Sequence, residues 1–217
     1  MPTAIDGRRA RGDRSRHAVL SVATQLASTE GLTGVSIARL AQETSSSKSG
    51  VATLFGSKEN LQLAIVEEAK RIFIDVVVEP ARIEPAGPDR LYALVRAWVD
   101  YSSGRTFEGG CFFLAASTEF AARPGAVRDA ITAAMDLWRS YLQHQTERAI
   151  ADGALPQLDD AGQLVFELEA LLAHANAEST LHDSDTPYRR AERAIAERLR
   201  ALGADARAAD RVRASFA

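Results

Sequence analysis

The stretch Ser36–Lys58, SIARLAQETSSSKSGVATLFGSK, decides which fold we expect for this chain. Its first part predicts a short helix, because Ile37, Leu40 and Ala41 recur at the i, i+3, i+4 spacing of one helical face. Four hydroxyl residues, Thr44–Ser47, follow directly. Such side chains compete for backbone hydrogen-bonding groups and favour turns and caps, so the helix is expected to end there.

A second short helix is expected after this turn. Val51 and Leu54 resume helical spacing, and Gly56 ends the helix after about two turns. Two short helices joined by a polar turn of about 3–4 residues form the helix-turn-helix pattern. The outward positions of the second helix are small or polar, which suits a helix that enters a groove: Ser47, Lys48, Gly50 and Thr53. Taken alone, the pattern is equally compatible with part of an ordinary helical core.

The composition is that of a globular protein. The length of 217 residues allows one or two domains, and 46% hydrophobic and 25% charged residues are ordinary values. No run approaches the roughly 18 consecutive apolar residues of a membrane span, and no secretory signal is expected. A single cysteine, Cys111, excludes an intrachain disulfide framework and fits a reducing cytoplasm. We therefore expect a cytoplasmic protein without a membrane partner.

The charge is distributed unevenly along the chain. The net charge is −3, yet residues 1–60 hold eight basic and five acidic side chains, against 18 and 24 in the remainder. Such asymmetry is a modest indication of an N-terminal end that binds nucleic acid. Residues 1–13 are Arg-rich and are expected to be a flexible basic arm, which either contacts DNA or is a plain solvated terminus.

Further helices are expected on both sides of the helix-turn-helix. One runs from Asp13 or Ser15 to about Thr29, and Ser57 caps another that extends to about Val78. The breaker-rich stretch 79–88 then predicts a domain boundary. Beyond it every periodic segment is helical, over about 89–103, 111–122, 125–153, 159–182 and 188–202. The fold class is therefore all-α, with about nine helices.

The N-terminal part resembles the TetR (tetracycline-repressor-like) family of transcriptional regulators. The resemblance covers about residues 14–65 and rests on Ile37-Ala38, Ser47-Lys48 and Phe55-Gly56-Ser57-Lys58-Glu59-Asn60-Leu61. The chain departs from the family in having Ser45 and Ser46 for glycine and valine, Gly50 for threonine, and Ala52 for a phosphate-contacting tyrosine. The recognition helix is therefore unusually small-sided.

The resemblance implies a division of labour along the chain. We expect a helix-turn-helix DNA-binding domain over 14–60, a connecting helix over 61–80 and a C-terminal regulatory and dimerisation bundle over 81–217. Phosphate contacts set the register on DNA and base-edge contacts set the sequence choice, and Lys48 can serve either purpose. The expected DNA-binding residues are Ser36, Ser46, Ser47, Lys48, Gly50, Val51, Thr53 and Lys58.

The resemblance also implies a homodimer on a palindromic operator, with the dimer seam on the last two helices. A twofold dimer reads half-sites about 34–36 Å apart or a multiple of that distance. The expected interface residues are Leu164, Leu168, Leu172, Ala175, Ile195 and Leu199. The alternative for these apolar side chains is the core of the single chain.

In the family the C-terminal bundle holds a small inducer, whose identity this sequence does not indicate. The candidate pocket residues are Trp98, Tyr101, Phe112, Phe113, Met135, Trp138 and Phe166, although helical aromatic stripes are more often core. Glu119, Glu169 and His174 could orient a ligand. Cys111 could sense redox state but fits inert packing better, and the histidines lack metal-ligand spacing.

These observations predict a ligand-responsive, homodimeric transcriptional repressor that an inducer releases from double-stranded DNA. No catalytic motif is present, and neither a cofactor nor a metal is expected. The competing interpretation is an all-α enzyme or small-molecule-binding protein whose N-terminal helices are structural.

Overall fold

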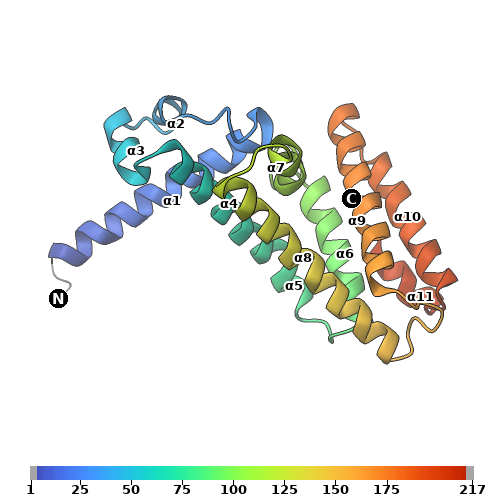
Figure 1. Ribbon diagram of the computed structural model, residues 1–217. Helices are drawn as coiled ribbons and strands as arrows, with labels where there is room; N and C mark the ends of the chain where they lie inside the picture. The colour runs from blue at the N-terminus through green and yellow to red at the C-terminus, as the bar shows by residue number, and fades with distance from the viewer. Residues whose placement is uncertain (1–3, 214–217) are drawn as a thin grey trace. The chain divides into compact units, whose positions relative to one another are not determined.

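The computed structural model describes residues 4–213, with side chains from Ser15 onward, and these residues contain helices and no strand (Figure 1). The expected all-α fold is confirmed. The nine expected helices are α1–α4 and α6–α10 within the described residues, and two short helices, α5 (Glu79–Ala81) and α11 (Ala206–Ala209), accompany them.

Helix α1 spans Ala4–Glu30 and begins well before the expected start at Asp13 or Ser15. Alanine and arginine are good helix formers, and they outweigh the two glycines of this segment. The expected disordered arm is thus helical in its backbone from Ala4, while residues 1–3 lie outside the described residues. Gly31, at φ +79°, ends the helix as expected.

The helix-turn-helix consists of α2 (Ile37–Glu43) and α3 (Lys48–Phe55). The Ser36 hydroxyl accepts a 3.2 Å hydrogen bond from Arg39 N and caps α2. The Ser47 hydroxyl likewise accepts a 3.0 Å bond from Gly50 N and caps α3. Serine side chains satisfy first-turn amides in this way, so the hydroxyl-rich turn fixes where both helices start.

Helix α4 (Lys58–Phe73) follows a cap at Ser57, whose hydroxyl accepts a 3.1 Å bond from Asn60 N. It continues through a π-helical segment, Ile74–Val78, into the short helix α5. The expected cap and the expected length to about Val78 are confirmed.

The chain divides into two compact units. The N-terminal unit comprises the chain through Arg71 together with Phe107–Thr132, and the C-terminal unit comprises Ile72–Thr106 and the chain from Ala133. This division corrects the expected boundary within 79–88, because α7 (Phe112–Phe120) packs against α1 and so belongs to the N-terminal unit.

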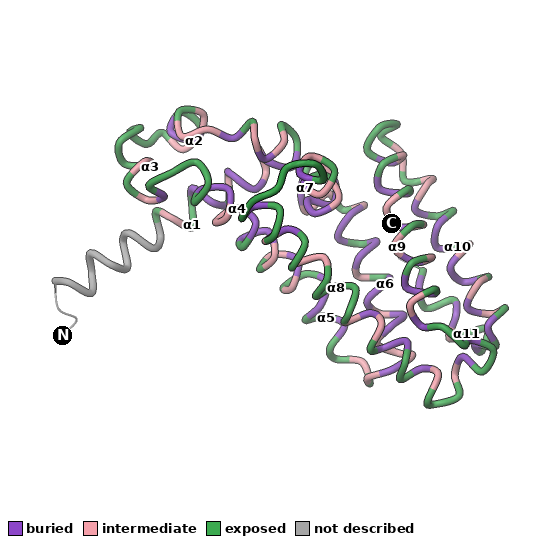
Figure 2. The backbone as a smooth tube through the Cα atoms, viewed as in Figure 1, coloured by how far each residue is buried: buried purple, intermediate pink, exposed green. Residues whose placement is uncertain are grey.

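Each unit buries its own apolar faces (Figure 2). In the N-terminal unit the fully or nearly fully buried side chains include Val19, Ala23, Leu40, Val51, Leu61, Ile65 and Phe112. In the C-terminal unit they include Leu91, Leu94, Val99, Leu142, Leu164, Tyr188 and Ile195. Burial of these faces is the main driving force for the packing of short helices that are marginal alone.

The remaining helices are α6 (Pro88–Ser103), α8 (Ala126–Ala151), α9 (Ala161–His182) and α10 (Thr186–Ala201), with a 3-10 turn at Asp210–Val212. Asp160 caps α9 by accepting a 3.1 Å bond from Gln163 N. Helices α9 and α10 lie side by side over most of their length (Figure 1). Among the described residues no helix is long and apolar enough to cross a membrane.

Candidate functional site

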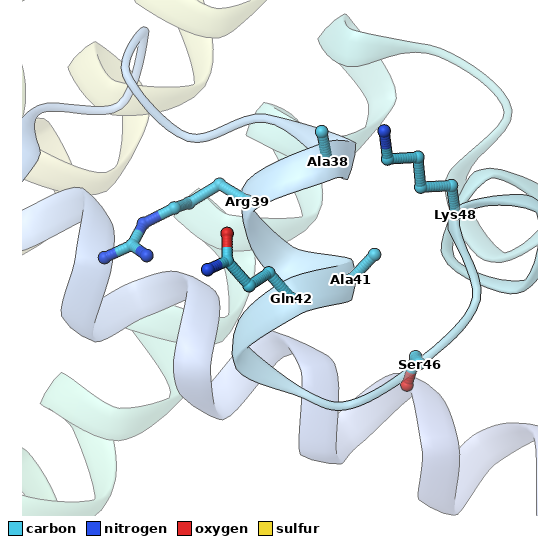
Figure 3. A pocket seen from close by; sticks show the side chains of 6 residues that line it. All are labelled: Ala38, Arg39, Ala41, Gln42, Ser46 and Lys48. Atoms are coloured by element: carbon cyan, nitrogen blue, oxygen red, sulfur yellow. The ribbon is translucent and has the colours of Figure 1, made fainter.

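The turn and first part of α3 form an exposed polar surface on the N-terminal unit. Ser46, Ser47, Lys48, Gly50 and Thr53 are all exposed. An open hollow of about 500 Å³ lies beside them, between α2 and the start of α3 (Figure 3). Its lining consists of Ala38, Arg39, Ala41, Gln42, Ser46 and Lys48.

The hydroxyl groups near this surface differ in whether their hydrogen atom is already used in a hydrogen bond within the chain. The Thr53 hydroxyl donates to Ser49 O at 2.8 Å, and the Ser46 hydroxyl donates to Thr44 O at 3.3 Å. The Ser36 hydroxyl is used as an acceptor in its cap and retains its own hydrogen, because a hydroxyl has one donor and two acceptor sites. Ser36 is therefore better placed than Thr53 to donate to a phosphate oxygen.

Two expected contact residues have structural roles. Val51 is completely buried, so its assignment as a base contact is corrected: its side chain fills the interior beneath α3. Lys58 Nζ donates to Thr33 O at 2.8 Å and holds the loop between α1 and α2. The ammonium group of Lys58 has three donors and is exposed, so this bond still leaves it able to meet a phosphate.

Helix α2 and helix α1 contribute residues that sequence reasoning did not single out. Arg39 and Gln42 line the hollow. Their positions opposite the apolar face of α2 could have indicated this from the sequence. Arg16 ties α1 to α3: its Nη1 donates to Leu54 O at 2.7 Å, and its guanidinium lies 4.7 Å from the Phe55 ring centroid. This cation–π contact fixes the end of α3 on α1.

The six expected dimer residues are all buried within the single chain. These residues are Leu164, Leu168, Leu172, Ala175, Ile195 and Leu199, and none is more than 2% exposed. Their assignment to a dimer interface is therefore corrected: they form an intramolecular core between α9 and α10. The outer face of α9 instead exposes two large apolar side chains, Phe166 at 67% and Leu181 at 75%.

The expected pocket residues separate into groups. In the C-terminal unit Tyr101 and Trp138 each meet the Phe73 ring edge-on, at centroid distances of 5.3 and 5.1 Å, and Trp98 lies 6.4 Å from Tyr101. Met135 is half-buried. Phe112 and Phe113 belong to the N-terminal unit, where their rings contact each other at 5.3 Å. The exposure of Phe166 corrects its assignment to a pocket.

The three polar candidates for orienting a ligand have other surroundings. Glu119 accepts hydrogen bonds from the loop between α1 and α2, and Glu169 accepts a 3.0 Å bond from Arg139 Nε. His174 is exposed on α9. Cys111 is buried, and the part of the chain that the structure describes contains no group of three residues that could hold a metal ion.

A buried polar cluster in the C-terminal unit was not foreseen from the sequence. The Ser102 hydroxyl of α6 donates to Asn176 Oδ1 of α9 at 2.9 Å and lies 2.7 Å from the Tyr188 hydroxyl of α10. All three residues are buried. Since buried polar groups are costly without partners, this cluster specifies how the three helices align.

Comparison with known protein families identifies the chain. The family model described as "Tetracyclin repressor-like, C-terminal domain" matches residues 87–195, which is half of the chain. The chain belongs to the TetR family. The resemblance first noted in the N-terminal helices is thereby confirmed from a different part of the molecule.

Solved structures of TetR-family regulators share the fold. A TetR regulator from Chloroflexus aurantiacus is 23% identical, with a TM-score of 0.78 over 89% of this chain and 94% of that one. A TetR-family regulator from Agrobacterium tumefaciens is 20% identical, with a TM-score of 0.77 over 86% and 98%. AibR, solved in complex with isovaleryl coenzyme A and operator DNA, is 20% identical, with a TM-score of 0.64 over 75% and 85%. No curated protein sequence matches the chain.

Proposed function

We propose that this TetR-family chain is a homodimeric, ligand-responsive transcriptional repressor that leaves a palindromic operator when a small inducer binds. The observation that carries the proposal is the exposed start of α3, with Lys48 beside a hollow that α2 and α3 share. A groove-entering helix needs such a small, polar and solvent-accessible N-terminal end. The family assignment supports the same function.

We choose the proposed DNA-contacting residues by the solvent exposure of their side chains. Lys48 is exposed at the first residue of α3 and can reach either a phosphate or a guanine edge. Arg39 and Gln42 of α2 lie on the same surface, where the Arg39 guanidinium is paired with Glu30 and Glu43. We propose that Ser36, Ser46, Ser47, Lys48, Gly50, Thr53 and Lys58 contact DNA, with Arg39 and Gln42 added and Val51 removed.

The dimer face that we propose is the outer stripe of α9. Phe166, Ala170, Ala173, Ala177 and Leu181 recur at spacings of three and four residues and are exposed or half-exposed. Spacings of three and four residues place these side chains on one face of the helix, and the central alanines let two copies approach closely. A twofold axis would place this stripe against itself in an isologous interface.

The ligand response that we propose starts at the aromatic group in the C-terminal unit. Tyr101 and Trp138 meet the Phe73 ring and Trp98 lies beside Tyr101, and aromatic side chains with a few polar groups are typical of small-molecule sites. Phe73 ends α4, so a ligand that displaces its ring would act on the helix that follows the helix-turn-helix. AibR shows that a protein of this fold takes a small molecule and operator DNA.

A band-shift titration over increasing salt tests DNA binding against the all-α enzyme or binding-protein alternative. Displacement of counterions makes the affinity for DNA fall steeply as salt rises, with a slope of about −0.9 for each neutralised phosphate. We expect binding at low salt and a linear loss on logarithmic axes. If the protein shifts no DNA at low salt, the helix-turn-helix is structural and the proposal fails.

A further inference from the structure

The loop between α1 and α2 determines where the helix-turn-helix begins. It leaves α1 at Gly31 and reaches the α2 cap at Ser36. Leu32 and Val35 are buried and anchor the loop by their side chains. The backbone groups of Leu32 and Thr33 are left to be satisfied by other parts of the N-terminal unit.

Glu119, near the end of α7, accepts hydrogen bonds from this loop. Its Oε2 accepts a 2.7 Å bond from Leu32 N, and its Oε1 accepts a 2.9 Å bond from Thr33 N. The Thr33 hydroxyl also donates to Oε1. The Glu119 side chain is only 17% exposed, so one largely buried carboxylate binds two adjacent amides and a hydroxyl. Hydrogen bonds to a charged group are the stronger class.

The carbonyls of the same two residues are held from α4. Lys58 Nζ donates to Thr33 O at 2.8 Å, and Gln62 Nε2 donates to Leu32 O at 3.2 Å. Each of the two residues is therefore held at its N–H by α7 and at its carbonyl by α4, and the peptide group between Leu32 and Thr33 is held on both sides. A shift of α7 relative to α4 would break bonds on one side or drag the loop with it.

The segment before α7 is docked on α1 at very close range. Glu108 N donates to Gln25 Oε1 at 3.1 Å, and Gly109 N donates to Ser28 Oγ at 3.2 Å. A β-carbon at Gly109 would lie 1.9 Å from Ser28 O, so only glycine fits there. The α7 segment is thus fastened at its start to α1 and near its end to the α1–α2 loop.

We propose that Glu119 is a positioning residue for DNA recognition. Helix α7 lies inside the region that the family's C-terminal model matches, yet it packs in the N-terminal unit. Through Glu119 it holds the loop that places the α2 cap, and therefore the angle at which α2 and α3 meet DNA. This inference rests on the proposed DNA-binding function and adds the residue that links α7 to it.

The test compares Glu119→Gln with wild type on two DNAs: a site selected from random sequences by the wild-type protein, and a random-sequence duplex. Glutamine keeps the shape but loses the charge and places an NH2 group opposite a loop donor. We expect the affinity for the selected site to fall about tenfold, with little change for random DNA, because misplaced helices lose base contacts first. Exchange of the Leu32 and Thr33 amides should accelerate.

Controls separate positioning from folding. Glu67→Gln removes an equally charged but exposed side chain on α4 and should bind both DNAs as wild type does. Partial unfolding would lower the affinity for both DNAs by the same factor and leave the ratio of the two affinities unchanged. An unchanged ratio would overturn the proposed role of Glu119. If Glu119→Gln does not fold, Thr33→Val, which removes only the hydroxyl donor, should lower the same ratio by about twofold. A wild-type protein without affinity for any DNA would instead refute the proposed function.

Discussion

At the scale of single residues, the role of serines as helix caps could be predicted from the sequence, whereas the burial of one expected DNA-contacting residue could not. Ser57 caps α4 as expected, and Ser36 and Ser47 cap α2 and α3 in the same way, because a serine directly before a helix can satisfy a first-turn amide. Val51 was counted among the DNA-binding residues, although its side chain is completely buried. Periodicity shows which residues share a face, but it does not show whether a small helix turns that face inward.

Lys48→Ala should weaken binding to DNA without loss of stability. If Lys48 meets a phosphate, its removal should lower affinity on all sequences to a similar extent and reduce the salt slope by about one. Because Lys48 is exposed, the free energy of unfolding should change by less than about 0.5 kcal/mol. Lys70→Ala, on α4 and paired with Glu67, serves as the charge-matched control in the same salt titration. A salt slope identical to wild type would contradict the contact.

The pH dependence of stability should contain a contribution from Glu68. The hydrogen bond from Arg71 lowers the pKa of this carboxyl below its usual 4.5 despite opposing desolvation, and the charges of Arg71 and His17 add to the lowering. A carboxyl with a depressed folded pKa stabilises the fold above its unfolded pKa and loses that contribution as the pH falls through the folded value.

Urea unfolding of wild type and Glu68→Gln across the acid range measures this contribution. We expect the wild type to be the more stable at neutral pH and the difference between the two to shrink as the pH falls below about 4.5. A difference that stays constant across that range would show that the charge of Glu68 contributes nothing to stability.

At the scale of helices, the positions of most elements could be predicted but their docking could not. Helix α7 was expected in the C-terminal domain, and the reason for its docking on α1 lies in Gly109, whose missing side chain lets two backbones touch. A single glycine carries no local signal of that long-range contact. Helix α1 begins earlier than expected, because the alanines and arginines among residues 4–13 favour a helix where a flexible basic arm was expected.

The polar cluster of α6, α9 and α10 should have a measurable role in stability. Tyr188→Phe removes the hydroxyl that lies 2.7 Å from Ser102 Oγ, so the buried Ser102 hydroxyl has one hydrogen-bond partner fewer. We expect a loss of about 1–3 kcal/mol in the free energy of unfolding. Tyr141→Phe removes a hydroxyl that accepts a long, 3.5 Å hydrogen bond from Arg90, and it should cost clearly less. Equal losses would mean that the cluster is not specifically stabilising.

At the scale of the whole molecule, the sequence predicted the fold and the family, whereas the residues that it suggested for a dimer seam are buried inside the single chain. The leucines at 164, 168 and 172 have the spacing of a helical seam, and the seam proves to be internal, between α9 and α10. Apolar periodicity identifies a buried face without stating whether the chain itself or a partner buries it.

Variants on the outer stripe of α9 should separate the dimer from the monomer. Leu181→Arg places a charge on the face that we expect to lie against its own copy, so the molecular mass measured by sedimentation should fall by half. Since Leu181 is 75% exposed in the single chain, the helical content should be unchanged. Ile83→Arg, at 86% exposure outside the stripe, provides the control and should leave the mass as it is. A dimer that withstands Leu181→Arg would contradict the proposed face.

Selection of bound sequences from random double-stranded DNA by the wild-type protein tests whether the chain reads DNA as a twofold dimer. We expect enrichment of one site with twofold symmetry, whose half-sites are about 34–36 Å apart or a multiple of that distance, because two α3 helices must enter successive major grooves on one face. Failure of any sequence to be enriched, or a site without symmetry, would contradict a dimer that reads DNA through α3.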